Sequence, residues 1–406
     1  MSQRKAHAFG ALTIPHYRTL FTGTLGSFTG FFMSTVLQGV VAFELTGTNT
    51  AVGSVVFGQG LGMLLFSPIG GAYADRLPKR RVVAIGQIIS ATIFGTLGFL
   101  FSIDQLTLGY LIAGAFTVGT AFGMLGPARS ALAVDLVPDA MRGNAMALNN
   151  VANTMSRVVG PFLAGLLLAY DWAGPAFAYG TISLLYLSSA TLLVLLPRSV
   201  VRENVGETHV LHDLKEGLRY VWNHKKLRTY LLFFVVVMLI GFPHVTLIPG
   251  LLENALGRDA RDLTDFYLAS AVGALFASLQ VARYADSENA PLLYSLMAVG
   301  FGGGLTALAW APSFEMAVAC MLLVGASSGG FHALSGAVIA RETEVVYMGR
   351  VMSLSMLAFA GFGLTALPLG VLADRIGERG VLFGMGATVF VISVWMATVE
   401  WRSMSS

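Results

Sequence analysis

Charged residues are scarce in this chain. They make up 12% of its 406 residues, whereas hydrophobic residues make up 55%. Soluble domains carry about 25% charged residues, and so few charges could not cover the apolar surface of a soluble protein of this size. Lipid is therefore expected to surround most of the chain. The net charge of +3 is also too small to indicate nucleic-acid binding.

Cysteine and the common catalytic motifs are equally poorly represented. The single Cys320 excludes a disulfide within the chain and any cysteine-based metal cluster. The sequence contains no phosphate-binding loop of the Gly-x-x-x-x-Gly-Lys-Ser/Thr type, no His-Glu-x-x-His and no Ser-centred nucleophile elbow. We therefore expect no enzyme activity, no cofactor and no metal site.

Long apolar runs, in contrast, are abundant. Twelve of them approach the ~20 residues needed to cross a bilayer, which predicts an all-α membrane protein with twelve transmembrane helices. They lie at 19–43, 50–74, 82–101, 106–134, 145–169, 173–196, 228–250, 265–285, 291–310, 314–340, 350–372 and 380–399. We expect an N-terminal six-helix bundle, a cytoplasmic linker and a C-terminal six-helix bundle, at 1–197, 198–227 and 228–406.

The basic residues predict how these spans are oriented. Of the 25 lysines and arginines, 20 fall on the side of the N-terminus, four on the other side, and Arg157 in the middle of a span. By the positive-inside rule, both termini face the cytoplasm, and we expect a multi-pass protein of the bacterial inner membrane. In the linker, Leu211, Leu214, Leu218 and Trp222 recur at helical spacing between basic residues, which predicts an amphipathic helix on the inner membrane surface that links the halves.

The two halves of the chain repeat each other. Matching segments occur in the same order at offsets of 206 to 211 residues, which indicates two pseudo-symmetric bundles with a cavity between them. The matches are Arg18-Thr19 with Arg228-Thr229, Tyr73-Ala74-Asp75 with Tyr284-Ala285-Asp286, and Val118, Gly119 and Gly123 with Val324, Gly325 and Gly329.

The loop after the second span carries a family signature. Its sequence, Gly71-Ala-Tyr-Ala-Asp75-Arg76-Leu-Pro-Lys-Arg-Arg81, resembles the signature of the major facilitator superfamily, with proline where that family usually has glycine. The resemblance implies that Asp75 and Arg76 form a cytoplasmic latch with the start of span eleven. Alternatively, the basic residues only anchor the loop. The residues implied in gating are Gly71, Asp75, Arg76, Asp135, Arg142, Gly349 and Arg350. A similar run at 370–377 lies on the outer side, and we interpret it as a helix end.

Further motifs resemble those of particular branches of that superfamily. Gly160-Pro161-Phe-Leu-Ala-Gly165 resembles the Gly-Pro motif of exporters, in which proline and glycine bend the helix, and the repeat places Pro368 nearby. The basic linker helix and the segments 139–144 and 348–350 resemble the branch of enterobactin-type siderophore exporters and macrolide efflux proteins. The arginine motif that proton-coupled drug antiporters carry in span four is absent between residues 108 and 119, which argues against simple proton–drug coupling.

Several polar side chains lie inside predicted spans, where they are costly and often functional. Arg157 is the first candidate for contact with an anionic substrate, although it could equally pair with a structural acid. Asn153 shares its helix face. His332 could carry a proton or only bind a neighbouring helix, and His244 follows Pro243 at an expected helix break. Gln59 and Gln38 are lower-ranked candidates.

The resemblance implies a secondary active transporter that exports a small amphipathic metabolite or drug, siderophore-like or macrolide-like, by alternating access. We expect an ion gradient to drive it, most simply protons, and the protein to be a monomer in the bilayer. The alternatives are a lipid-like substrate, import rather than export, or a membrane sensor that does not transport.

Overall fold

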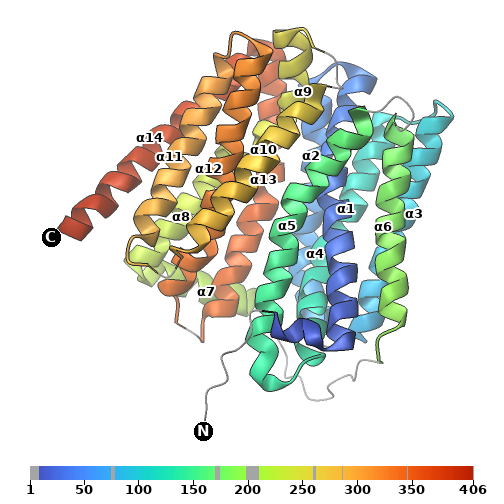
Figure 1. Cartoon of the computed structure of the whole chain (residues 1–406), viewed down its shortest axis with the longest axis vertical. Helices are drawn as coiled ribbons and strands as arrows, with labels where there is room; N and C mark the ends of the chain where they lie inside the picture. Colours follow the sequence, from blue (N-terminus) through green and yellow to red (C-terminus); the bar gives the residue numbers. More distant parts are fainter. Residues whose placement is uncertain are drawn as a thin grey trace.

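The structure is a computed structural model that describes residues 9–74, 78–169, 174–197, 210–258, 262–285, 287–344 and 346–405. These residues are almost entirely helical (Figure 1). The first six long helices are α1 (Pro15–Thr46), α2 (Asn49–Ala74), α3 (Lys79–Ser102), α4 (Leu108–Asp135), α5 (Arg142–Ala169) and α6 (Gly174–Val194). The short 3-10 turns η1 (Gly10–Thr13) and η2 (Asp139–Met141) precede α1 and α5.

The second half begins with the linker helix α7 (Val210–Asn223). It continues with α8 (Lys225–Ile240), η3 (Phe242–Thr246), α9 (Ile248–Gly250), the π-turn η4 (Leu251–Ala255), α10 (Leu263–Ala282), α11 (Ala290–Ala309), α12 (Phe314–Arg341), α13 (Met348–Ile376) and α14 (Glu378–Ser405). Twelve of the described helical segments are long and apolar enough to cross a membrane. The predicted fold class is therefore confirmed, with several helices longer than the apolar runs alone indicated.

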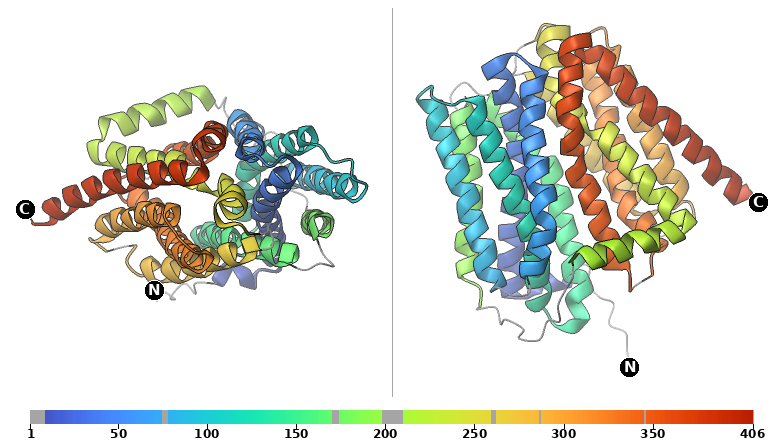
Figure 2. Two further views of the ribbon diagram at one scale, coloured as in Figure 1. Left: turned by 90° about the horizontal axis from the view of Figure 1, so that it is seen from above. Right: turned by 180° about the vertical axis from the view of Figure 1, so that it is seen from behind.

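Helices α1 to α6 form one bundle, and α8 to α14 form the other (Figures 1 and 2). We call the end of the molecule where α7 lies the linker end, and the end where α2 begins and α13 finishes the far end. The ribbons of the two bundles converge at the far end and diverge toward the linker end (Figure 1). Helix α7 runs across the linker end beneath the second bundle (Figure 2).

Matching glycines pack the repeated helices in the same way. A Cβ on Gly119 of α4 would overlap the backbone carbonyl of Gln59 in α2. In the second bundle, a Cβ on Gly325 of α12 would overlap the carbonyl of Ser270 in α10. The offsets between these partners, 206 and 211 residues, are those of the sequence repeat. Small residues let helix backbones approach where lipid supplies no hydrophobic driving force, so the repeat preserves the closest helix contacts.

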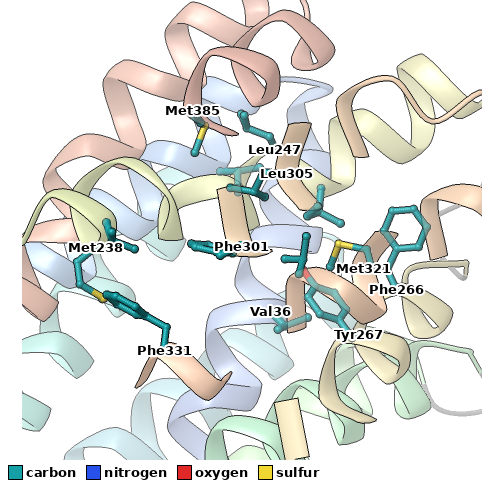
Figure 3. Packing of buried hydrophobic residues seen from close by; sticks show 14 of the residues in the cluster. Val36, Met238, Leu247, Phe266, Tyr267, Phe301, Leu305, Met321, Phe331 and Met385 are labelled. Atoms are coloured by element: carbon teal, nitrogen blue, oxygen red, sulfur yellow. The ribbon is translucent and has the colours of Figure 1, made fainter. Parts of the chain in front are cut away.

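The seventh span is broken, as Pro243 predicted. Helix α8 ends at Ile240. The 3-10 turn η3 follows at Phe242–Thr246, and the α-helix resumes at Ile248. The ring of Phe242 packs 5.1 Å from that of Phe301 and holds the turn against α11. One buried cluster runs through this region and includes Val36 of the first bundle with Tyr267 and Met321 of the second (Figure 3). The interrupted helix is thus supported by the core rather than exposed to lipid.

Candidate substrate cavity

A cavity of about 620 Å³ lies between the two bundles. Its walls come from α1, α2 and α5 on one side and from η3, α10, α12 and α13 on the other. Aromatic and small apolar side chains make up much of the lining, and a few polar groups converge on it. Five of the six predicted substrate or proton candidates line the cavity, namely Arg157, Asn153, His332, His244 and Gln59.

Arg157 lies in the middle of α5 and is held from three sides. Its Nε donates to Oδ1 of Asn153 at 3.0 Å, one helical turn earlier, as their shared face predicted. Its Nη1 is 3.4 Å from Nε2 of His332, and its guanidinium lies 5.0 Å from the centre of the Phe32 ring. A charge in mid-membrane costs about 2.5–3.5 kcal/mol on insertion scales. These contacts and the cavity reduce that cost while leaving the group beside an open volume.

His332 of the second bundle lies beside Arg157. It lies on α12, and its ring meets Phe242 edge-on with the centroids 4.8 Å apart and Phe234 at 6.2 Å. Because Arg157 belongs to the first bundle and His332 to the second, their contact crosses the boundary between the halves. A relative motion of the bundles must therefore change it.

The remaining candidates differ in their surroundings. His244 is buried in η3, and its Nδ1 lies 2.9 Å from the carbonyl oxygen of Gly241. The imidazole therefore contacts the backbone at the point where α8 ends. Gln59 is 6% exposed and lines the cavity, and its Nε2 has no hydrogen-bond partner among the described residues. Gln38 is buried in α1 and is not among the described residues that line the cavity.

The cavity also contains groups that the sequence interpretation missed. Ser328, His332 and Ser335 lie on one face of α12 and all line it, a helical spacing that could have been recognised around the histidine. Tyr267 adds a phenol from α10. Among the described residues that line the cavity there is no aspartate or glutamate. The arrangement suits an amphipathic molecule that places an anionic group near Arg157.

At the far end, a direct contact between α2 and α13 joins the two bundles. Asp374 of α13 accepts hydrogen bonds at Oδ1 from the backbone N–H of Asn49 (2.8 Å) and from its side-chain Nδ2 (3.0 Å). Its Oδ2 accepts from the backbone N–H of Thr50 (2.8 Å) and from Oγ1 of Thr50 (2.5 Å). The carboxylate thus caps the first turn of α2, where unpaired N–H groups and the helix dipole favour a negative charge.

Further contacts surround this cap. Glu378 is buried and accepts from Nδ2 of Asn49 and from Nδ2 of Asn254, each at 2.8 Å. A Cβ on Gly370 would lie 2.5 Å from the backbone oxygen of Asn49, so that only glycine allows this approach. The sequence interpretation of the 370–377 run as a helix end missed that it joins the two bundles.

A second contact between the bundles joins α10 to α5. Oγ1 of Thr264 in α10 donates to the backbone oxygen of Gly165 in α5 at 2.5 Å. A Cβ on Gly165 would lie 3.0 Å from Cα of Thr264. Gly160 lets α5 approach Thr29 and Phe32 of α1, while Pro161 and Pro368 lie inside α5 and α13. Of the four predicted bend residues, Gly160 and Gly165 therefore allow close packing of α5 against its neighbours.

At the linker end, three of the gating candidates form ion pairs with other described residues. Asp135 of α4 binds Lys79 of α3 at 2.6 Å, and Arg142 binds its neighbour Asp139 at 2.7 Å. Arg350 of α13 binds Glu216 of α7 at 3.0 Å. Gly71 lies in the last turn of α2, and Gly349 borders open space. Asp75 and Arg76 lie outside the described residues, so the predicted latch remains a prediction.

Comparisons with known proteins agree with this architecture. The model of the Major Facilitator Superfamily matches residues 20–360. The chain is 22% identical over 386 residues to macrolide efflux protein A of Streptococcus pyogenes, covering 92% of this chain and 94% of that protein. It is 24% identical over 358 residues to the staphyloferrin A transporter of Staphylococcus aureus (strain NCTC 8325 / PS 47), with 87% and 88% covered.

A solved structure shows the same fold. A bacterial homologue of the human lysosomal transporter Spinster, in an inward-facing and occupied conformation, aligns with a TM-score of 0.73 at 13% identity, over 95% of this chain and 96% of that one. The match to the family model covers most of the sequence, from α1 into α13. The chain belongs to the Major Facilitator Superfamily, and it is a membrane transporter of a small molecule rather than an enzyme.

Proposed function

We propose that this transporter exports a small amphipathic molecule carrying an anionic group. The observation that supports this most directly is Arg157, a cation at the wall of a cavity whose described lining contains aromatic rings but no acid. An anionic group on the substrate would interact with this guanidinium, while the rings of Phe31, Phe32 and Phe242 would cover its apolar part.

We place the linker end in the cytoplasm of a bacterial cell and the far end outside. The support is the distribution of lysine and arginine along the chain. With this orientation the described conformation is inward-open, because the α2–α13 and α5–α10 contacts close the outer end. Residues 1–197 and 228–406 would move as two bodies connected by 198–227, in a monomer.

The two ends would be latched in alternation. In the inward-open state, Asp374 holds the start of α2 at the outer end. These hydrogen bonds must break when the cavity opens outward. Asp75 and Arg76 would then hold the inner end against the start of α13. Each latch thus stabilises one of the two states between which substrate binding shifts the population.

The names of relatives support export more than import. One is called a macrolide efflux protein, and another is named for transport of staphyloferrin A. We therefore propose a siderophore-like or macrolide-like molecule as substrate and an ion gradient as the energy source, most simply protons. His332 is the proposed proton site, because its imidazole lines the cavity and can gain and lose a proton, and because its contact with Arg157 makes its charged form sensitive to an anionic substrate bound at that guanidinium.

Purified protein in liposomes tests this proposal. A panel of amphipathic carboxylic acids, each beside its own amide, is first screened by thermal shift, and the stabilising compounds are then tested for transport with and without a pH gradient. We expect the acids to stabilise the protein more than their amides and a pH gradient to drive their movement. Equal effects of acid and amide would reject the anionic site. Binding without movement under any gradient would instead favour a sensor.

A further inference from the structure

The linker helix α7 has one face on the protein and one face free. On the protein side, the ring of Tyr220 stacks on Tyr347 with the centroids 4.0 Å apart, and its hydroxyl oxygen accepts from the backbone N–H of Glu344 at 3.1 Å. Gly217 and Val221 are also buried on this side. These contacts fix the rotation of the helix and therefore determine which residues its other face presents.

That other face combines cations with exposed apolar side chains. Leu218 and Arg219 each lie three or four residues from both Lys215 and Trp222, so these four residues form a single stripe on the helix. All four are exposed, Leu218 by 53% and Trp222 by 61%. Lys225 and Lys226, also exposed, extend the positive charge into the start of α8. We call these six residues the α7 basic face.

Few acids within the segment oppose this charge, although Glu400 of α14 lies near Lys226. Within residues 215–228 the sequence has five lysines and arginines and one acid, Glu216. That acid is directed away from the basic face, because it binds Arg350 of α13 at 3.0 Å. Arg228 packs its guanidinium 5.2 Å from the Trp222 ring and donates to the Trp222 carbonyl at 3.0 Å, which holds the indole at the entry to the span that begins at Lys225.

We propose that the α7 basic face binds anionic phospholipid headgroups at the membrane surface. The helix lies across the ends of the spans (Figure 2), where the headgroups of a surrounding bilayer are located. Tryptophan and leucine among lysines and arginines are typical of helices that insert one face at the interface and attract anionic lipid. Aromatic rings of this kind prefer the headgroup level.

Lipid bound to this face would act on α13. Glu216 and Tyr220 attach α7 to Arg350, Glu344 and Tyr347, at and just before the first turn of α13. A Cβ on Gly217 would lie 3.0 Å from Cβ of Arg350, so the two segments cannot slide freely. Because α13 also carries Asp374 at its other end, lipid that fixes α7 stabilises the position of a helix that closes the cavity.

Fluorescence quenching tests lipid binding without any substrate. The full-length protein is placed in nanodiscs that contain phosphatidylcholine with a minor fraction of brominated phosphatidylglycerol or, in parallel, of brominated phosphatidylcholine. The protein has five tryptophans, so the Trp222 signal is the difference between wild type and Trp222→Phe. We expect at least twofold stronger quenching of this signal by the brominated anionic lipid, reduced by raised salt.

A matched pair of variants separates the proposed face from general surface charge. In one, Lys215, Arg219, Lys225 and Lys226 are replaced by glutamine. In the other, the same replacement is made at four exposed arginines at the linker end, Arg18, Arg283, Arg341 and Arg402. Only the first variant should lose the preference for anionic lipid. Equal quenching by the two lipids in wild type, or the same loss in both variants, would overturn the proposal.

Hydrogen exchange tests the link to α13. Anionic lipid should slow amide exchange in the first turns of α13, from Met348 on, in wild type, and this slowing should disappear in Glu216→Gln. Exchange that does not respond to lipid in wild type would contradict the link. These readouts need no substrate or ion gradient, so their outcome is independent of the direction and cargo proposed above.

Discussion

Asp374 in α13 accepts hydrogen bonds from both the backbone N–H and the hydroxyl of Thr50, the second residue of α2. The two residues are 324 positions apart and belong to different bundles. The same carboxylate accepts two more hydrogen bonds from Asn49. Four hydrogen bonds to one carboxylate at the start of a helix therefore join the two bundles at the far end. Gly53 and Gly370, which have no side chain, allow α2 and α13 to lie close enough to form these hydrogen bonds.

Asp374→Asn should shift the protein toward the state in which the far end is open. The amide loses the negative charge and cannot accept all four hydrogen bonds, and each charge-assisted bond contributes about 1.5–3 kcal/mol. With Cys320 replaced by serine, a cysteine at Val52, which lines the cavity, should react at least tenfold faster with a maleimide added from the far side. The control is Glu315→Gln, whose carboxylate is exposed and lies 3.9 Å from Arg258. Equal rates in both variants would exclude the latch.

Arg157→Gln should reduce transport of an anionic substrate at least tenfold while leaving membrane insertion intact. The variant keeps polarity but removes the charge that faces the cavity, and a hydrogen bond to a charged group contributes about 1.5–3 kcal/mol. Arg157→Lys should recover part of the activity, because it retains the charge but not the fork that reaches both Asn153 and His332. The measurement is the initial rate in liposomes, with Arg283→Gln as the control. Wild-type rates in Arg157→Gln would remove this residue from the site.

His332→Gln should separate substrate movement from the proton gradient. Glutamine can still hydrogen-bond to Arg157, but it does not change charge near neutral pH. Movement of substrate down its own gradient should persist, whereas the additional accumulation driven by a pH gradient should be lost. His244→Gln provides the comparison, because His244 lines the same cavity. Coupling that survives in His332→Gln and disappears in His244→Gln would assign the proton to the other histidine.

Gly119→Ala should destabilise the folded protein more than Gly126→Ala in the same helix. A Cβ at Gly119 would overlap the carbonyl of Gln59, whereas none of the described atoms that could obstruct a Cβ lies within 4 Å at Gly126. Forcing extra volume into a packed contact costs about 1–3 kcal/mol. Thermal unfolding in detergent measures the difference. Equal melting temperatures would mean that α2 and α4 can separate at no cost, which contradicts the packing described for the repeat.

Much of the architecture could be predicted from the sequence, because lipid imposes strong rules on composition. The need to satisfy backbone groups in apolar surroundings makes each long apolar run a helix, and the matching glycines at 119 and 325 indicate the duplication. The rarity of charge inside a span also identified Arg157 before its partners were known. These inferences depend only on which residues lie near one another along the chain, and this can be read from the sequence itself.

The far-end contact could not be predicted in the same way. The sequence shows that Asp374 follows a span, but it does not show that this helix end meets Asn49 and Thr50 of a distant helix. Nor does it show whether a polar side chain such as Gln38 is directed into the cavity or packed within its own bundle, because a small helix rotation decides this. Both questions concern how helices are placed relative to one another, which local composition does not state.

Distance measurements between spin labels at the two ends test alternating access most directly. In the Cys320→Ser background, one pair is placed at Leu45 and Ile376 at the far end and another at Met146 and Val346 at the linker end, all exposed positions. Asp374→Asn, or a substrate found by the screen, should lengthen the far-end distances and shorten the linker-end distances together. Distances that stay fixed at both ends, or that lengthen at both ends, would contradict a cavity that opens to one side at a time.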